Sequence, residues 1–194
     1  MKNITIIDYG AGNVKSVKFA LERLGAKVKL SSNPEEIKNA DKVIFPGVGR
    51  AKFAMERLRE SGLTELIPNL KQPLLGICLG MQLLCEHSEE DNVDGIGIFP
   101  LKVKRFKNDL KVPKIGWNNI SDLKGDLFDA INENEYCYFV HSYYVEDSKY
   151  SSASSNYGLK YSAALQKDNF YATQFHPEKS GKTGELMLKN FIEL

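Results

Sequence analysis

The sequence has neither a surplus of one charge nor a long apolar run. Its 194 residues hold 26 lysines and arginines against 25 aspartates and glutamates, a formal net charge of +1. This balance gives no electrostatic footprint for nucleic acid. No apolar run approaches the roughly 20 residues that span a bilayer, and Asp8 and Gly10 come too early for a signal peptide. We expect a cytoplasmic protein that binds a small molecule or a protein, and neither nucleic acid nor a membrane.

Cysteine is scarce, and its spacing excludes two common uses. The three cysteines, Cys78, Cys85 and Cys137, show no paired spacing of the disulfide or zinc kind. The glycine loop at residues 9–13 lacks the full dinucleotide fingerprint and predicts a tight turn. We therefore expect no metal and no cofactor. Cys85 and Cys137 have apolar neighbours typical of core residues, which leaves Cys78 as the chemical candidate.

The first half of the chain alternates between two kinds of segment. Apolar runs predict strands, and amphipathic spacing predicts helices. This order is typical of a parallel sheet covered by helices on both faces. The predicted strands cover residues 4–7, 28–30, 43–45 and 73–77, and the predicted helices cover 14–24, 51–59 and 81–86.

Beyond about residue 96 the pattern changes to strands and turns, which predicts a mixed or antiparallel extension. A closing helix is expected to pack back on the sheet, and the serine-rich stretch is interpreted as a surface loop or an edge hairpin. No domain boundary is needed, so residues 1–194 are predicted to form one domain. The strands are predicted at 101–106, 136–140, 163–166 and 170–175, the serine-rich stretch lies at 148–155, and the helix at 186–194.

Cys78 lies between two glycines where a predicted strand meets a predicted helix, in Gly76-Ile77-Cys78-Leu79-Gly80. This is the pattern of a nucleophile elbow with sulfur in place of oxygen. Larger side chains two positions away on either side are expected to collide with the neighbouring strand and helix. The free amides at the start of the helix favour a thiolate. The alternative is a buried structural cysteine in a glycine-rich turn.

His176 is the candidate base, because Glu178 stands two residues later in Gln-Phe-His-Pro-Glu. On an extended chain both side chains would point to the same side, so that the carboxylate orients the imidazole as in other triads. His141 is the rival base, but it has no acid within the next four residues. His87 is interpreted as an exposed residue at the end of the helix that follows Cys78.

The glycine-rich turn after the strand at 43–45 is the candidate oxyanion hole. Gly47 and Gly49 let the backbone turn an amide toward the site. With the amide of Leu79 it supplies the two donors that a tetrahedral intermediate requires. The alternative is an ordinary turn between a strand and a helix.

With these residues in place, the chain resembles class I (triad) glutamine amidotransferases, through Gly-Ile-Cys-Leu-Gly-Met-Gln at 76–82 and Gln-Phe-His-Pro-Glu-Lys-Ser at 174–180. The resemblance implies a three-layer, flavodoxin-like α/β fold with a mostly parallel central sheet. It implies that Cys78 forms a glutamyl thioester, that His176 protonates the departing ammonia and that Glu178 orients His176. The glutamine-binding residues that it implies are Gly47, Gln82, Ser142 and Tyr143.

Four further motifs are similar to those of the family of glutaminase subunits of imidazole glycerol phosphate synthase, at residues 8–13, 46–49, 116–118 and 138–143. This similarity implies a heterodimer with a (β/α)₈-barrel cyclase subunit that receives the ammonia. It places Asn13, Trp117 and Lys179 at the interface and Val48 in a switchable oxyanion strand. Such a subunit is expected to be nearly idle alone.

One departure keeps alternatives open. The family commonly has a histidine two residues before Gly-Trp-Asn, where this sequence has Lys114. A related glutaminase that serves a sugar-modifying, amidine-forming synthase is therefore a second hypothesis. A catalytically silent regulatory subunit is a third. The fourth, a cysteine hydrolase of the α/β-hydrolase type, would have its acid before the histidine, whereas Glu178 follows His176.

Overall fold

The core of the molecule is a seven-stranded sheet in which five neighbouring strands run parallel. The computed structural model describes residues 2–10, 14–107 and 110–194. The strand order is β11-β12-β13-β4-β3-β1-β2, with β11 and β12 antiparallel to their neighbours. The strands are β1 (Asn3–Ile7), β2 (Lys27–Ser31), β3 (Lys42–Gly47), β4 (Leu74–Cys78), β11 (Ser151–Asn156), β12 (Lys160–Lys167) and β13 (Phe170–Thr173).

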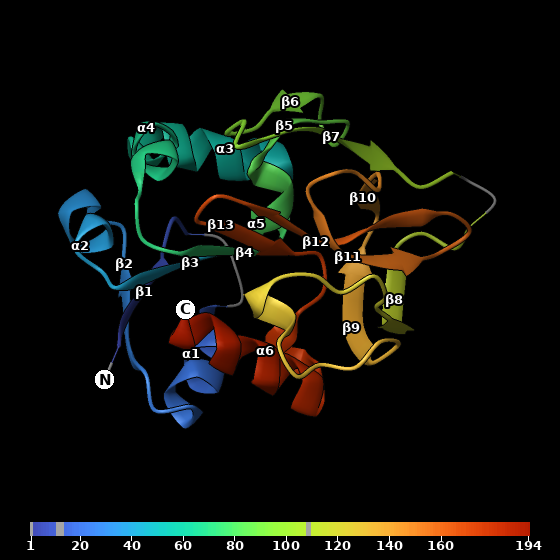
Figure 1. The fold of residues 1–194 in the computed structure, drawn as a ribbon. Helices are drawn as coiled ribbons and strands as arrows, with labels where there is room; N and C mark the ends of the chain where they lie inside the picture. Colours follow the sequence, from blue (N-terminus) through green and yellow to red (C-terminus); the bar gives the residue numbers. More distant parts are fainter. Residues whose placement is uncertain (1, 11–13, 108–109) are drawn as a thin grey trace.

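Helices cover both faces of this sheet, as the sequence predicted (Figure 1). Alternation along β1 explains the two layers, because Ile6 packs into one apolar cluster and Ile7 into the other. The first cluster lies under α1 (Val14–Arg23) and α6 (Gly181–Glu193). The second lies under α2 (Pro34–Lys38), α3 (Ala51–Glu60), α4 (Leu63–Leu66) and α5 (Leu79–Leu83). The three-layer α/β architecture is therefore confirmed.

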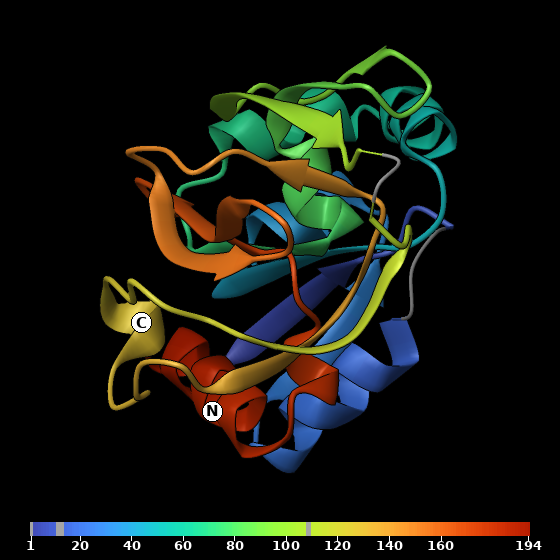
Figure 2. The same cartoon turned by 90° about the vertical axis from the view of Figure 1, so that its right-hand side faces the viewer.

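The expected mixed extension is also present, as a second sheet and a two-stranded ribbon. The second sheet has the order β10-β7-β5-β6, and the ribbon pairs β8 with β9. The ribbon lies at the end of the molecule opposite α2, and Figure 2 shows it from in front. The strands are β5 (Cys85–Ser88), β6 (Val93–Asp94), β7 (Phe99–Arg105), β8 (Lys114–Asn119), β9 (Tyr136–His141) and β10 (Tyr143–Val145), and three short 3-10 helices are η1 (Ile67–Asn69), η2 (Asp126–Phe128) and η3 (Pro177–Lys179).

The predicted helix at 81–86 is wrong in its second half. Helix α5 ends at Leu83, and β5 follows with Cys85 and Ser88 buried. The short apolar run Leu83-Leu84-Cys85 is compatible with a helix or a strand. Cys85 belongs to a strand because it pairs with Phe99 of β7. His87 therefore lies on a strand rather than at a helix end, where its Nδ1 is 2.9 Å from Asp94 Oδ1.

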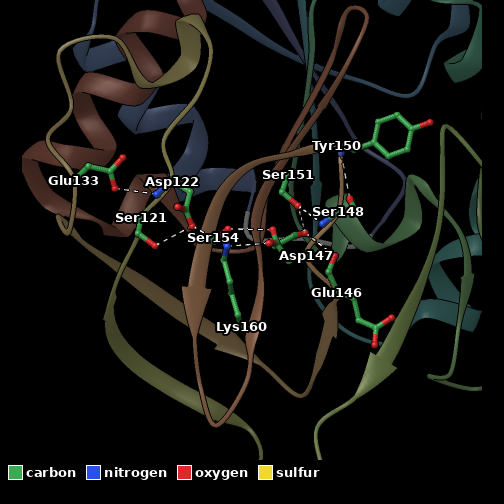
Figure 3. Close-up of polar contacts among 11 residues, drawn as sticks. Ser121, Asp122, Glu133, Glu146, Asp147, Ser148, Tyr150, Ser151, Ser154 and Lys160 are labelled. Atoms are coloured by element: carbon green, nitrogen blue, oxygen red, sulfur yellow. Dashed lines mark hydrogen bonds and ion pairs between the residues drawn. The ribbon is translucent and has the colours of Figure 1, made fainter.

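The serine-rich stretch forms the edge hairpin that was one of its two interpretations. Strand β11 is the sheet edge, yet its serines are buried because the chain around residue 121 covers them. The backbone amides of Ser121 and Ser154 donate to each other's carbonyls at 2.9 and 2.7 Å. Lys160 joins Asp122 and Asp147 across the same edge, at 3.0 and 2.9 Å (Figure 3). This cover protects the edge against pairing with another chain.

The parallel topology decides where chemistry can take place. Strands β3, β4 and β13 are neighbours, so their carboxyl ends at Gly47, Cys78 and Thr173 meet at one edge of the sheet. Within the described ranges, no helix has the length and apolarity to cross a membrane, and no cluster of three metal-binding side chains occurs. The single domain over residues 1–194 stays a prediction.

Candidate active site

Cys78 has a strained backbone at the junction of β4 and α5. Its φ of 56° and ψ of −108° lie in a region of backbone conformation that residues other than glycine rarely adopt. Gly80 is required beside it, because a Cβ there would stand 2.0 Å from the carbonyl oxygen of Phe45 on β3. At Gly76 a Cβ would stand 3.1 Å from the Gly80 carbonyl carbon. The steric reason expected for the glycines is thus present on both sides of the cysteine.

His176 follows β13 and faces both Cys78 and Glu178. Its Nδ1 lies 2.9 Å from Glu178 Oε1, and the two side chains are only 6% and 1% exposed. Because Nδ1 is in contact with Glu178, Nε2 is the ring nitrogen left for the thiol, and Cys78 contributes to the raised pKa of the ring. The expected extended chain is wrong, since Pro177–Lys179 forms the 3-10 turn η3. The turn brings the carboxylate back onto the ring.

The surroundings of His176 favour its charged form. Burial lowers its pKa, but the hydrogen bonds to Cys78 and Glu178 and the negative charge of both groups outweigh burial and raise the pKa well above its ordinary value. Glu178 has a second carboxylate oxygen, Oε2, that is buried with no hydrogen-bond partner. The carboxylate is therefore directed to the imidazole alone, which suits a thiolate–imidazolium pair.

His141 is held in a form that cannot act as the base. Its Nδ1 donates to the Tyr143 carbonyl at 2.7 Å, and its Nε2 accepts from the Tyr161 hydroxyl at 3.4 Å. Burial is the main cause that lowers its pKa to about 4. Both ring nitrogens are engaged and the ring is neutral, so the geometry favours His176 over its rival.

A cavity of about 300 Å³ opens beside the thiol. Gly47 pairs in register with Cys78 on the neighbouring strand. Trp117 is 52% exposed on β8 and is not part of the cavity wall, and Asn13 falls outside the described residues. Together with Cys78 and His176, the wall includes six predicted residues, Val48, Leu79, Gln82, Ser142, Tyr143 and Lys179.

The cavity also includes an acid that sequence reasoning missed. Glu90 lies in the turn after β5 and lines the cavity. Its carboxylate accepts a hydrogen bond from the Ala51 amide at 2.9 Å, while burial raises its pKa. Nothing in the local sequence distinguishes it from Glu89 and Asp91. Only the packing of this turn against the start of α3 brings Glu90 to the cavity.

The candidate oxyanion segment is fixed at both ends. The hydroxyl of Tyr9, to whose side chain the sequence analysis assigned no role, donates to the Pro46 carbonyl at 2.8 Å. At the other end Arg50 pairs with Asp91. Between these anchors a Cβ on Gly47 would stand 2.8 Å from the Gly80 amide nitrogen. The backbone of this segment is therefore pressed against the chain that carries the thiol.

Comparison with known proteins shows the family to which the chain belongs. The sequence model of the family "Glutamine amidotransferase class-I" matches residues 5–194. The chain belongs to this family. Its relatives include proteins named imidazole glycerol phosphate synthase subunit HisH, from Bacteroides fragilis (57% identity, 98% of this chain and 99% of the relative), Haemophilus influenzae (52%, 100% and 98%) and Escherichia coli K12 (47%, 99% and 100%).

Solved structures support the fold. A putative GMP synthase component from Thermoplasma acidophilum has a TM-score of 0.77 at 22% identity, over 100% of this chain and 93% of that one. The structure of PurLQS from Thermotoga maritima has a TM-score of 0.76 at 17% identity, over 100% and 99%. Identities this low bear on architecture alone.

Proposed function

We propose that this chain is the glutaminase subunit of imidazole glycerol phosphate synthase, which hydrolyses glutamine and passes the ammonia to a cyclase subunit in histidine biosynthesis. The observation that carries the proposal is the strained Cys78 beside the buried His176–Glu178 pair in one cavity. The full-length relatives at 47–57% identity bear the name of that synthase subunit. The proposed reaction uses side chains and backbone amides of this chain, and no step in it requires a metal or a cofactor.

The proposed reaction has two halves. The Cys78 thiolate attacks the carboxamide carbon of glutamine, and the C–S bond forms as the oxygen becomes an oxyanion held by the amides of Val48 and Leu79. His176 donates its proton to the amide nitrogen, the C–N bond breaks, and ammonia leaves. His176 then takes a proton from water, whose oxygen attacks the thioester, and glutamate leaves as the thiolate re-forms.

The cavity wall suits glutamine as the substrate. Glu90 offers a partly buried carboxylate for the α-ammonium group. Gln82 and the chain at Ser142 and Tyr143 line the same space and supply polar groups for the rest of the molecule. Gly47 is proposed to contact the bound glutamine through its backbone, because it lies beside Cys78 at a position where only a glycine fits.

The β8–β9 ribbon is the proposed docking surface for the (β/α)₈ cyclase subunit. Trp117 is 52% exposed and packs edge-on against Tyr138, over which Lys179 places its ammonium at 6.0 Å. An exposed tryptophan of this kind is typical of an interface. Asn13 completes the proposed interface, outside the described residues. Because Lys179 also lines the cavity, ammonia released there would have a short route into the partner.

Lys114 stands where the family commonly has histidine, but its contacts give no reason to prefer a different partner synthase. Its ammonium lies 5.2 Å from the Tyr157 ring and 3.4 Å from the Trp117 carbonyl. These are contacts within the chain. The relatives' names favour the histidine-pathway synthase over a sugar-modifying one. A cytoplasmic location and a single domain over residues 1–194 are part of the same proposal, supported by the biosynthetic role that those names state and by the family match over 5–194.

The test is a glutamate-release assay with purified chain alone, with a histidine-pathway cyclase subunit, and with an amidine-forming sugar synthase, each with its acceptor. We expect the cyclase subunit, and not the sugar synthase, to stimulate glutamate release strongly. Stimulation only by the sugar synthase would transfer the proposal to the second hypothesis. Failure of a glutamine-like electrophile to label Cys78 in the cyclase complex, with the fold intact, would point to a silent subunit.

A further inference from the structure

Gln174 is a buried side chain in contact with the nucleophile, and the proposed reaction gives it no role. It directly follows β13 and is 0% exposed. Its Nε2 lies 3.8 Å from Cys78 Sγ, and its Oε1 accepts from Gln82 Nε2 at 2.9 Å. Its own backbone amide donates to the Ala163 carbonyl at 2.8 Å. Both ends of this amide side chain are therefore in fixed positions.

The direction of these hydrogen bonds is set by a backbone carbonyl. Gln82 Nε2 also lies 3.2 Å from the Tyr143 carbonyl oxygen, which can only accept. The NH₂ group of Gln82 must face it, because the opposite orientation would set two oxygens against each other. The neighbouring Gln174 must then present its oxygen to Gln82 and its NH₂ group to the sulfur. The alternative orientation of either amide leaves a repulsive contact in a buried place.

We propose that Gln174 is a catalytic residue that donates a hydrogen bond to the Cys78 sulfur, oriented by Gln82, whose NH₂ group donates to both the Tyr143 carbonyl and Gln174 Oε1. This inference rests on the proposed glutaminase function. A hydrogen bond to the charged form of a group favours that form. The amide can donate to a thiolate but cannot remove the thiol proton, so it assists His176 without competing with it.

The chain of hydrogen bonds has consequences for both halves of the reaction. Sulfur in a thioester accepts hydrogen bonds poorly, so the donor from Gln174 matters most when the sulfur is a thiolate, before attack and again when Cys78 departs from the glutamyl group. The two hydrogens of Gln82 Nε2 are taken by Tyr143 and Gln174. Gln82 therefore has its Oε1 left for glutamine, which limits its binding role to accepting a hydrogen bond.

The experiment measures alkylation of Cys78 by iodoacetamide across pH, in the full-length chain, because this reaction needs the thiolate but no bound glutamine. Gln174→Glu keeps an acceptor for Gln82 and replaces the donor with a carboxylate. Gln174→Met keeps the volume without a donor. We expect the midpoint of the alkylation profile to move up by about one pH unit in both variants, so that the rate at pH values below the midpoint falls on the order of tenfold. Gln166→Glu, on β12 and outside the cavity wall, is the matched control.

A wild-type alkylation profile in either folded variant would overturn the inference. Gln82→Met cuts the chain of hydrogen bonds one residue further from the sulfur and is expected to move the midpoint in the same direction by less, which a purely local packing defect at Gln174 does not predict. Thermal unfolding of each variant checks the fold. The proposed function fails separately, if the wild-type cyclase complex releases no glutamate while Cys78 alkylates normally.

Discussion

Removing the charge of Glu178 tests whether the carboxylate stabilises a charged His176. In Glu178→Gln the shape is kept, but the 2.9 Å contact to His176 Nδ1 loses its ionic component. Two charges about 4 Å apart interact by about 4 kcal/mol at an effective dielectric constant near 20. At 1.36 kcal/mol per unit, the pKa of His176 should fall by about three units. An NH₂ group turned toward Nδ1 would also place the ring proton on Nε2, where it blocks uptake of the thiol proton.

The assay is steady-state glutamate release by the cyclase complex at several pH values. We expect kcat to fall on the order of 10²- to 10³-fold with little change in KM. Since the raised pKa of His176 keeps the ring charged as pH rises, activity should be lost at lower pH in the variant than in the wild type. Glu185→Gln removes the same charge from an exposed position on α6 and serves as control. A Glu178→Gln complex within threefold of wild-type kcat would show that the carboxylate does not stabilise a charged His176 during the reaction.

Three other perturbations test the fold, the interface and the neutral histidine. Gly80→Ala forces a Cβ to within 2.0 Å of the Phe45 carbonyl and should cost about 3 kcal/mol or more in urea unfolding; a loss below about 1 kcal/mol would contradict the packing. Trp117→Ala should leave the free energy of unfolding within about 0.5 kcal/mol of the wild-type value but weaken cyclase binding at least tenfold. Phe53→Ala removes a ring on α3 that is 47% exposed and should leave cyclase binding unchanged. Burial lowers the pKa of His141 to about 4. The free energy of unfolding should therefore fall by up to about 1.4 kcal/mol per pH unit as the pH drops from about 6.5 toward 4. If the free energy of unfolding of His141→Gln fell just as steeply over this pH range, the buried neutral histidine would not be its cause.

Short-range patterns carried most of what sequence could predict. The nucleophile elbow was recognisable because its glycines, strand and helix lie within a few residues of Cys78. The spacing of His176 and Glu178 indicated that the two side chains face each other, and they are in contact, but through a 3-10 turn and not through the extended chain that was expected; their catalytic roles stay predictions. The helix after Cys78 was predicted too long, because the short apolar run Leu83-Leu84-Cys85 carries no information on the partner strand that makes Cys85–Ser88 a strand.

Long-range contacts are what the sequence left out. Tyr9 and Pro46 are 37 residues apart, and Gln82 and Gln174 are 92 residues apart. Neither pair has a local signal, because each depends on the order in which parallel strands meet in the sheet. Glu90 is hidden for the same reason among neighbouring acids. Only the folded chain places these polar groups around Cys78.

The role of Cys78 as the nucleophile is tested most directly by a comparison of the three cysteines in one assay. Cys78→Ala, Cys85→Ala and Cys137→Ala are each combined with the cyclase subunit, checked for assembly, and assayed for glutamate release with the acceptor present. All three cysteines are buried, but of the three only Cys78 lines the cavity. We predict that Cys78→Ala abolishes glutamate release while the other two assembled variants keep it within a few-fold of wild type. Partner-stimulated glutamate release that survives in Cys78→Ala would contradict it.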